Sequence, residues 1–206
     1  MLKIYSALAI VAVVGLLGGT ALVAWQQKQS DPFASCRGSA VATGAAALGG
    51  AFTLVDEDGK TVTDKEVLAK PSLVYFGYSF CPDVCPFDAA RNAEAVDILA
   101  EKGIDVTPVF ITIDPERDTP EVMKDFAENL SPKMVGLTGT VEQTTAASRA
   151  YKTFFKKQDS GDEFYLMDHS TFTYLMLPGT GFADFFGRDD TPQQMADRTA
   201  CFIEHS

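Results

Sequence analysis

The hydrophobic pattern divides the chain into one long apolar segment at the N-terminus and a series of short apolar runs after it. No residue from Ile4 to Trp25 is charged, and this is the length that a bilayer-spanning helix of about 20 residues requires. The next 25 or so residues are polar or rich in Ala, Gly and Ser without periodicity, a composition typical of a linker. The pattern therefore predicts an N-terminal membrane anchor (residues 1–30), a flexible tether (31–50) and one folded domain (51–206).

Strand and helix patterns alternate within this domain. The Asp-Gly pair at 58–59 separates two short apolar runs and predicts a β-hairpin. Further strands are expected at 72–77, 106–113, 134–137, 171–177 and 182–186. Helices are expected at 88–102, from the cap at Thr119, at 141–155, and from the capping box at Thr191 to about Glu204. This order predicts an α/β domain in which a mixed sheet carries helices on both faces.

The ends of the apolar segment indicate its orientation. Lys3 precedes it, which by the positive-inside rule leaves the N-terminus in the cytoplasm. A cleaved secretory signal is the alternative, but its apolar region would be shorter, and Leu22-Val23-Ala24-Trp25 is a poor cleavage site. In either case the domain is exported, so its cysteines are expected to lie in an oxidising compartment.

Charge and composition narrow the classes of partner. The formal net charge is −11, and Lys3 and Lys28 are the only charged residues among the first 30. A domain this acidic does not attract nucleic acid or anionic lipid. Its charge suits a basic partner or a cation, although solubility alone is a sufficient reason for it. With 46% hydrophobic residues, the chain can fill a core.

Two cysteines lie between the predicted strand at 72–77 and the helix that follows it. Cys81 and Cys85 are separated by Pro82-Asp83-Val84, and Pro86 follows. At a helix N-terminus, free N–H groups and the helix dipole stabilise thiolate, which binds soft metals and attacks disulfides. A structural disulfide or a pair of buried core cysteines is the alternative, but the two prolines argue against burial within a regular helix and favour a rigid, exposed turn. The motif therefore predicts a metal or redox site.

Most metal sites need a third ligand, and the chain has two histidines. His205 is the penultimate residue, as expected of a solvated tail. His169 directly precedes the predicted strand at 171–177. A lone histidine is more often structural than a ligand. Only a fold that brings its loop against the cysteine turn would make His169 a candidate.

Three segments together resemble the SCO/SenC family of copper chaperones for cytochrome c oxidase. They are Phe76–Pro86 (FGYSFCPDVCP), Asp114–Pro120 (DPERDTP) and Asp168-His169-Ser170. The resemblance covers nearly the whole domain and implies a thioredoxin-like fold with an added N-terminal hairpin and an insertion. It further implies that Cys81, Cys85 and His169 bind one copper ion, as Cu(I), Cu(II) or both, for delivery to the binuclear copper site of the oxidase.

The donor set agrees with that implication. Two thiolates and one imidazole make a soft, low-coordinate site suited to copper, and three ligands leave one side open to a partner's ligand. Asp168 is a candidate to orient His169 by accepting its second ring N–H, although a solvated turn carboxylate is an equal alternative. The implied partners are the copper-accepting oxidase subunit and other copper chaperones. The implied location is the periplasmic or intermembrane-space side of the membrane.

The assignment of Cys81 and Cys85 to copper also suggests how the remaining two cysteines pair. If copper occupies the first pair, Cys36 and Cys201 are left to form a disulfide that pins the tether to the last helix.

A different class of function is also compatible with the motif. A thiol–disulfide oxidoreductase would use Cys81 as attacking thiolate and Cys85 as resolving thiol, to keep the oxidase cysteines reduced. Such an enzyme does not need His169, which therefore distinguishes the two functions. A thioredoxin-fold peroxidase would gain nothing from the second cysteine.

Overall fold

The computed structural model describes residues 5, 13–20, 22–23, 32–37, 48–159 and 164–206. Residues 13–20 are helical. Within these described ranges, no helix has both the length and the apolar character needed to cross a membrane. Most of the predicted anchor (1–30) and of the predicted tether (31–50) lies outside the described residues.

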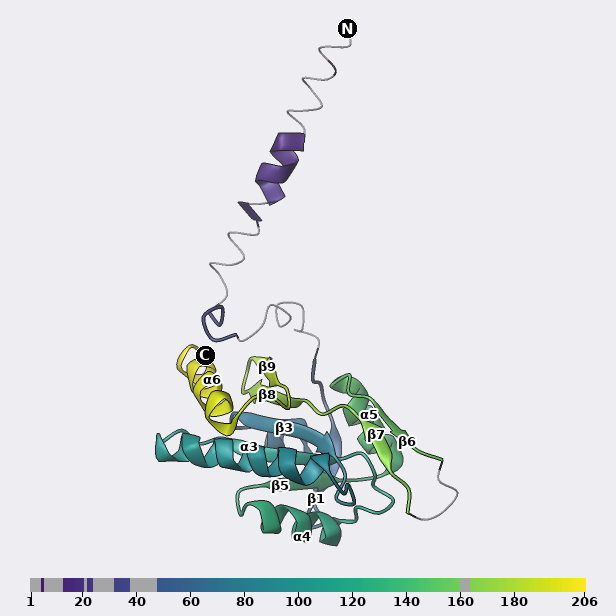
Figure 1. The fold of residues 1–206 in the computed structure, drawn as a ribbon. Helices are drawn as coiled ribbons and strands as arrows, with labels where there is room; N and C mark the ends of the chain where they lie inside the picture. The colour runs from purple at the N-terminus through teal and green to yellow at the C-terminus, as the bar shows by residue number, and fades with distance from the viewer. Residues whose placement is uncertain (1–4, 6–12, 21, 24–31, 38–47, 160–163) are drawn as a thin grey trace.

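A seven-stranded mixed sheet forms the centre of the domain (Figure 1). The strand order is β2-β1-β5-β4-β3-β8-β9. The bounds are β1 (Thr53–Asp56), β2 (Thr61–Thr63), β3 (Ser72–Gly77), β4 (Thr107–Thr112), β5 (Val135–Thr138), β8 (Thr173–Leu177) and β9 (Gly181–Phe186). β3 pairs in parallel with β4 and antiparallel with β8. Both flanks of β3 are therefore covered, and all six of its residues are buried, as expected for its unbroken apolar run.

Five described helices accompany the sheet: α2 (Asp64–Val67), α3 (Val84–Glu101), α4 (Pro120–Leu130), α5 (Val141–Ala150) and α6 (Pro192–Glu204). The threonines that precede α4 and α6 accept hydrogen bonds from Val122 and Gln194. These two helix starts confirm the cap positions predicted from the sequence.

The helices lie on both faces of the sheet. Phe76 of β3 packs against Tyr151, the residue that directly follows α5, with ring centroids 5.1 Å apart. Leu73 of the same strand belongs to a second cluster, which contains Leu99 of α3 and Phe202 of α6. A sheet with helices packed on both of its faces agrees with the thioredoxin-like fold that the resemblance implies. The predicted N-terminal hairpin is confirmed, because β1 and β2 pair antiparallel at the edge of the sheet.

Between α5 and β8, one prediction was wrong and one small sheet was missed. The helix expected over 141–155 ends at Ala150, and Lys152, with φ 52°, turns the chain away from it. The residues beyond form a separate two-stranded sheet that was not predicted, made of β6 (Phe155–Lys157) and β7 (Met167–His169). Phe155 lies opposite His169 in this sheet. The hairpin is an insertion before β8, and it carries the candidate histidine.

Candidate metal centre

The cysteine pair lies where the chain passes from β3 into α3. The backbone N–H of Cys81 donates to the carbonyl of Tyr78 at 3.3 Å, which closes a turn after the strand. The helix begins at Val84, earlier than predicted, so Cys85 occupies its first turn. The Cys85 backbone N–H then points at Cys81 Sγ, 3.5 Å away. This is the helix N-terminal setting that stabilises a thiolate.

The two sulfurs are less accessible than the prolines suggested. Cys81 is 9% exposed and Cys85 is fully buried. Pro82 lies on the surface as expected, but the prediction of an exposed cysteine turn was wrong. The reason is that α3 starts early and turns Cys85 inward, against β3.

His169 reaches this turn from the inserted hairpin. Its Nε2 lies 3.2 Å from Cys85 Sγ. Its other ring nitrogen, Nδ1, lies 2.8 Å from the carbonyl oxygen of Ser170. Because a carbonyl can only accept, Nδ1 carries the proton in the neutral ring and the Nε2 lone pair faces the sulfurs. The ring therefore has the tautomer that a metal ligand needs.

The structure thus brings all three predicted ligands together. The sulfurs of Cys81 and Cys85 and a ring nitrogen of His169 lie within 4.8 Å of one another. Two sulfurs and one nitrogen at this spacing fit a soft cation held in low coordination. His169 is only half-buried, which leaves one approach to the group from solvent.

The two thiols have very different acidities. The hydrogen bond from the Cys85 thiol lowers the pKa of Cys81 well below its ordinary range, and the backbone N–H groups of Asp83 and Cys85 contribute further. Burial opposes this shift. The pKa of Cys85 is raised, first by its hydrogen bond to Cys81 and then by burial. The pair therefore rests as a thiolate at Cys81 and a thiol at Cys85.

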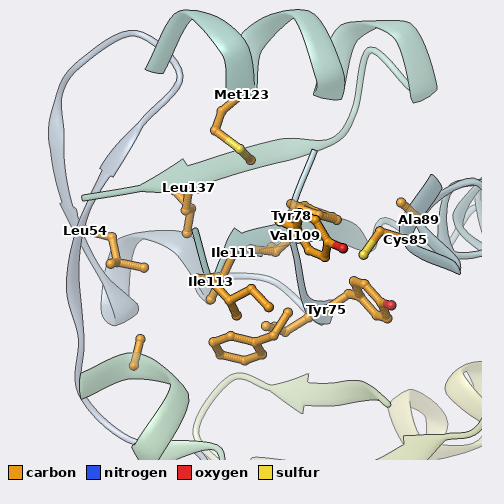
Figure 2. Close-up of a cluster of buried hydrophobic side chains, with 14 of the residues drawn as sticks. Leu54, Tyr75, Tyr78, Cys85, Ala89, Val109, Ile111, Ile113, Met123 and Leu137 are labelled. Carbon is orange, nitrogen blue, oxygen red and sulfur yellow. The ribbon is translucent and has the colours of Figure 1, made fainter. Parts of the chain in front are cut away.

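Three residues of the β3 segment that the sequence did not single out shape the pocket around Cys85. Tyr78 lies beside its sulfur in Figure 2, and the ring planes of Tyr75 and Tyr78 are both nearly perpendicular to the ring of His169. A Cβ on Gly77 would lie 2.9 Å from Cys85 Sγ, closer than side chains tolerate. The position of this glycine, at the end of a buried strand and before the cysteine motif, is the sequence signal that could have identified it.

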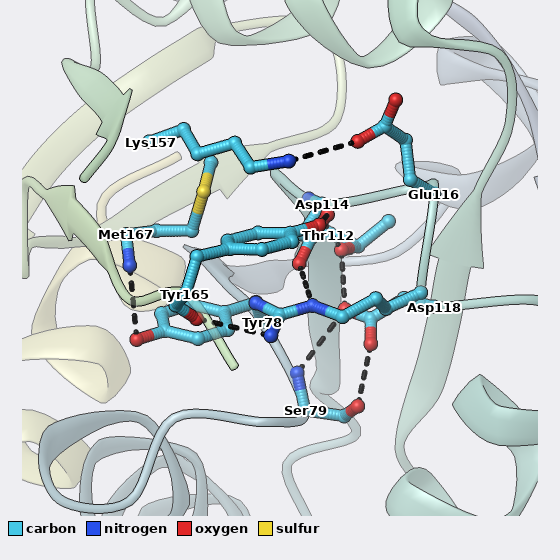
Figure 3. Close-up of polar contacts among 10 residues, drawn as sticks. Tyr78, Ser79, Thr112, Asp114, Glu116, Asp118, Lys157, Tyr165 and Met167 are labelled. Atoms are coloured by element: carbon cyan, nitrogen blue, oxygen red, sulfur yellow. Dashed lines mark hydrogen bonds and ion pairs between the residues drawn. The ribbon is translucent and has the colours of Figure 1, made fainter. Parts of the chain in front are cut away.

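A buried carboxylate fixes the start of the cysteine turn (Figure 3). Asp118 is fully buried and accepts hydrogen bonds from the Ser79 backbone N–H at 3.1 Å and the Ser79 hydroxyl at 2.5 Å. It also accepts from the Thr112 hydroxyl at 2.5 Å. Burial raises the pKa of Asp118, although these hydrogen bonds oppose the shift. Asp118 therefore ties the turn to the end of β4 rather than only preceding a helix cap.

A second polar cluster connects the inserted hairpin to the same loop. Tyr165 donates its hydroxyl to Asp114 at 2.7 Å, and Arg117 donates to the other Asp114 oxygen at 2.5 Å. The Arg117 guanidinium stacks on the Tyr165 ring at 3.6 Å and lies 5.0 Å from the Phe80 ring. Arg117 thus contacts the segment before β7 and the residue before Cys81. This contact fixes the position of the β6–β7 hairpin, which carries His169, relative to the turn that carries Cys81.

The prediction that Asp168 orients His169 was wrong. Asp168 is exposed and accepts a hydrogen bond from Gln158 at 2.6 Å. Successive residues of a strand point to opposite sides, so the two side chains on β7 diverge. The carbonyl of Ser170 takes the orienting role instead. Met167, which precedes Asp168, is buried, and its backbone N–H donates to the Tyr78 hydroxyl at 3.2 Å.

The other two cysteines lie at the C-terminal end of α6. The structure joins Cys36 to Cys201 by a disulfide, with Cα atoms 5.6 Å apart. Residues 32–37 therefore lie beside the end of the last helix (Figure 1). His205 Nδ1 lies 3.7 Å from Cys36 Sγ.

Comparison with known proteins identifies the class to which this fold and site belong. The family model described as SCO1/SenC matches residues 40–204. Protein SenC of Rhodobacter capsulatus is 54% identical over 196 residues, which cover 95% of this chain and 87% of SenC. The mitochondrial protein SCO1 homolog 1 of Arabidopsis thaliana is 41% identical over 155 residues, which are 75% of this chain but only 46% of the plant protein.

A solved structure supports the same grouping. The crystal structure of Arabidopsis thaliana ScoI with copper bound superposes with a TM-score of 0.72 at 38% identity, covering 77% of this chain and 99% of that one. The chain belongs to the SCO1/SenC family, and the resemblance drawn from its three motifs is confirmed.

Proposed function

We propose that this protein is a copper metallochaperone that holds one copper ion through Cys81, Cys85 and His169. We infer further that it delivers the ion to the binuclear copper site of cytochrome c oxidase. The single observation that carries the proposal is the approach of His169 Nε2 to 3.2 Å from Cys85 Sγ. The copper bound in the structure of the plant relative supports the choice of metal.

The arrangement of the thiols gives an order to copper binding. Cys81, held as thiolate, offers the first sulfur without loss of a proton. Cys85 must release its proton as it coordinates, so binding acidifies the solution. The Nε2 lone pair of His169 completes a three-ligand site, because Nδ1 is already engaged by Ser170. Oxidation of the two thiols to a disulfide would remove both sulfur ligands, which makes the site sensitive to redox state.

Release requires that a partner's ligand can approach the ion. Exposed aromatic side chains flank the cysteines: Phe80 is 53% exposed and Phe87 is 69% exposed. We propose that these rings contact the copper-accepting subunit while its own ligands replace those of the chaperone one by one. The N-terminal apolar segment would anchor the domain on the exported side of the membrane, where that subunit is exposed.

A thiol–disulfide oxidoreductase remains the second candidate, and the unequal acidity of the two thiols favours it. Cys81 has the lowered pKa of an attacking thiolate, and Cys85 is buried behind it as a resolving thiol would be. In this role the protein would reduce the oxidase cysteines before copper arrives.

Replacement of His169 separates the two functions. The variant His169→Ala keeps both thiols and removes the only imidazole of the group. If the protein is a chaperone, cells that carry this variant lose oxidase activity while the purified variant still reduces a disulfide peptide. The neighbouring variant Asp168→Ala is the matched control, because Asp168 lies on the same strand and points away. Normal oxidase assembly with His169→Ala would contradict the chaperone role and favour the reductase.

A further inference from the structure

A second convergence of two sulfurs and an imidazole lies outside the centre described above. Cys36, Cys201 and His205 offer ligand atoms that all lie within 4.8 Å of one another. His205 Nδ1 lies 3.7 Å from Cys36 Sγ and 4.0 Å from Cys201 Sγ. The donor types are those of the first centre, and the proposed function makes no use of them.

The two groups are separate sites. Cys81 and Cys85 belong to one core cluster and Cys36 to the other. Figure 1 shows the C-terminal end of α6 and the strand β7 on opposite sides of the domain. One ion cannot therefore bridge them.

Packing keeps Cys36 at the end of α6 independently of the disulfide. Phe33 is 8% exposed, and its ring centroid lies 5.1 Å from that of the fully buried Phe202. The Cys36 backbone N–H donates to the Phe33 carbonyl at 3.0 Å, which closes a tight turn. Cleavage of the disulfide would therefore leave the two sulfurs as neighbours. A dithiol held in this way is preorganised for a metal ion.

We propose that Cys36 and Cys201, once reduced, form with His205 a second soft-metal site that binds one Cu(I) ion. The two thiolates and the imidazole match the ligand preference of this cation. Cys201 is half-buried and His205 is exposed, so a reductant and an ion can both reach the group. The disulfide form has no thiolate and does not bind, so the disulfide bond and the bound ion are mutually exclusive uses of the same two sulfurs.

The steps balance with a dithiol as reductant. The dithiol supplies two electrons and two protons and becomes a disulfide, while the Cys36–Cys201 bond breaks and each sulfur takes a proton. Binding of Cu(I) then releases both thiol protons to solvent. In the disulfide form, His205 Nδ1 donates to the Cys201 carbonyl at 2.8 Å. On metal binding that proton leaves Nδ1 and one is taken up at the other ring nitrogen, which frees the Nδ1 lone pair to bind the ion.

The test uses the full chain in detergent with the first centre removed by Cys81→Ser and Cys85→Ser. Half of the sample is reduced with a phosphine, which is then removed anaerobically. Both halves are titrated with Cu(I) against a chromophoric Cu(I) chelator. The reduced half is expected to bind one equivalent and the oxidised half none. Adding His205→Ala to this protein should weaken Cu(I) binding at least about tenfold, because loss of a residue that only orients a ligand already costs about that much affinity. Ser206→Ala is the control and should leave the affinity unchanged.

Three results would overturn the proposal. The first is the absence of Cu(I) binding after alkylation and mass spectrometry show that both thiols are free. The second is equal affinity with and without His205, which would exclude the imidazole as a ligand. The third is loss of the folded circular dichroism spectrum on reduction, since the preorganised pair would then not exist.

Discussion

Gly77 is where a single added methyl group would test the packing that positions the candidate copper ligands. In Gly77→Ala, the new Cβ would lie 2.8 Å from Tyr75 Cε1, 2.9 Å from Cys85 Sγ and 2.9 Å from Phe110 Cζ. Favourable contact between such atoms begins near about 3.5 Å. Each neighbour would therefore have to move by roughly 0.6–0.7 Å.

None of these neighbours can move into solvent. Tyr75 is 1% exposed, and Cys85 and Phe110 are fully buried. Overpacking of a close-packed core costs typically about 1–3 kcal/mol, and three simultaneous contacts place this variant in the upper part of that range. A displaced Cys85 sulfur also leaves the roughly 0.5 Å tolerance of a preorganised site. We therefore expect Cu(I) affinity to fall at least about tenfold, or about 1.4 kcal/mol.

Two measurements on the same samples check this expectation: denaturant unfolding of the metal-free protein and Cu(I) competition titration. Gly187→Ala is the matched control, because among the described residues beyond its chain neighbours only a carboxylate oxygen of Asp190 comes within 4.0 Å of the added Cβ. That variant should behave like the unmodified protein. If Gly77→Ala kept both its stability and its copper affinity, the close approach of β3 to Cys85 would be refuted.

Three further perturbations follow from the structure. Iodoacetamide should alkylate Cys81 rapidly at pH 6, because the pKa of Cys81 is lowered, whereas an ordinary cysteine is only about 0.3% thiolate at this pH. Cys85→Ala removes the thiol that donates to Cys81 and should slow the reaction. Equal rates for the two proteins would contradict the hydrogen bond from Cys85 to Cys81. Asp118→Asn should destabilise the fold by about 1–3 kcal/mol and weaken copper binding, because an amide cannot accept all three hydrogen bonds. The control for both measurements is Asp125→Asn, at an exposed position of α4, the helix that follows Asp118. Cys36→Ser should lower the free energy of unfolding by about 3–5 kcal/mol, because the disulfide spans 165 residues of sequence. A loss below about 1 kcal/mol in denaturant titration would contradict this loop-closure argument.

The elements that the sequence predicted well are those with strong local signals. β3 is an unbroken apolar run, and its bounds were predicted without error. The starts of α4 and α6 each carry a threonine cap followed by proline, which restricts the backbone before any tertiary contact forms. The pair of cysteines was identified for a similar reason, since it lies between a clear strand and a clear helix.

The parts that sequence reasoning missed depend on contacts between distant segments. β6 and β7 have three residues each, too few for an alternating pattern, and they exist because they pair with one another. The helix prediction continued past Ala150 because nothing in the residue pattern marks the turn at Lys152. The orienting role given to Asp168 failed for a related reason. Whether Asp168 or Ser170 faces Nδ1 of His169 depends on the strand register, which the unrecognised hairpin sets.

Family resemblance, rather than residue pattern, identified His169. A lone histidine more than 80 residues from the cysteines carries no local sign of its contact with Cys85, and only the fold places the two side chains together. The buried polar residues Asp114, Arg117 and Asp118 entered the sequence analysis only as part of the segment Asp114–Pro120 that resembles the family. Their burial and their links to the cysteine turn and the hairpin became apparent in the three-dimensional arrangement.

The most direct test of the proposed centre is X-ray absorption at the copper edge on the protein loaded with one equivalent of copper. The loaded sample should be compared with His169→Ala and with Cys36→Ser, which removes the second group of ligands. The account predicts two sulfurs and one nitrogen around copper, with the nitrogen lost in His169→Ala and retained in Cys36→Ser. A nitrogen that persists without His169, or a first shell with fewer than two sulfurs in the unmodified protein, would contradict it.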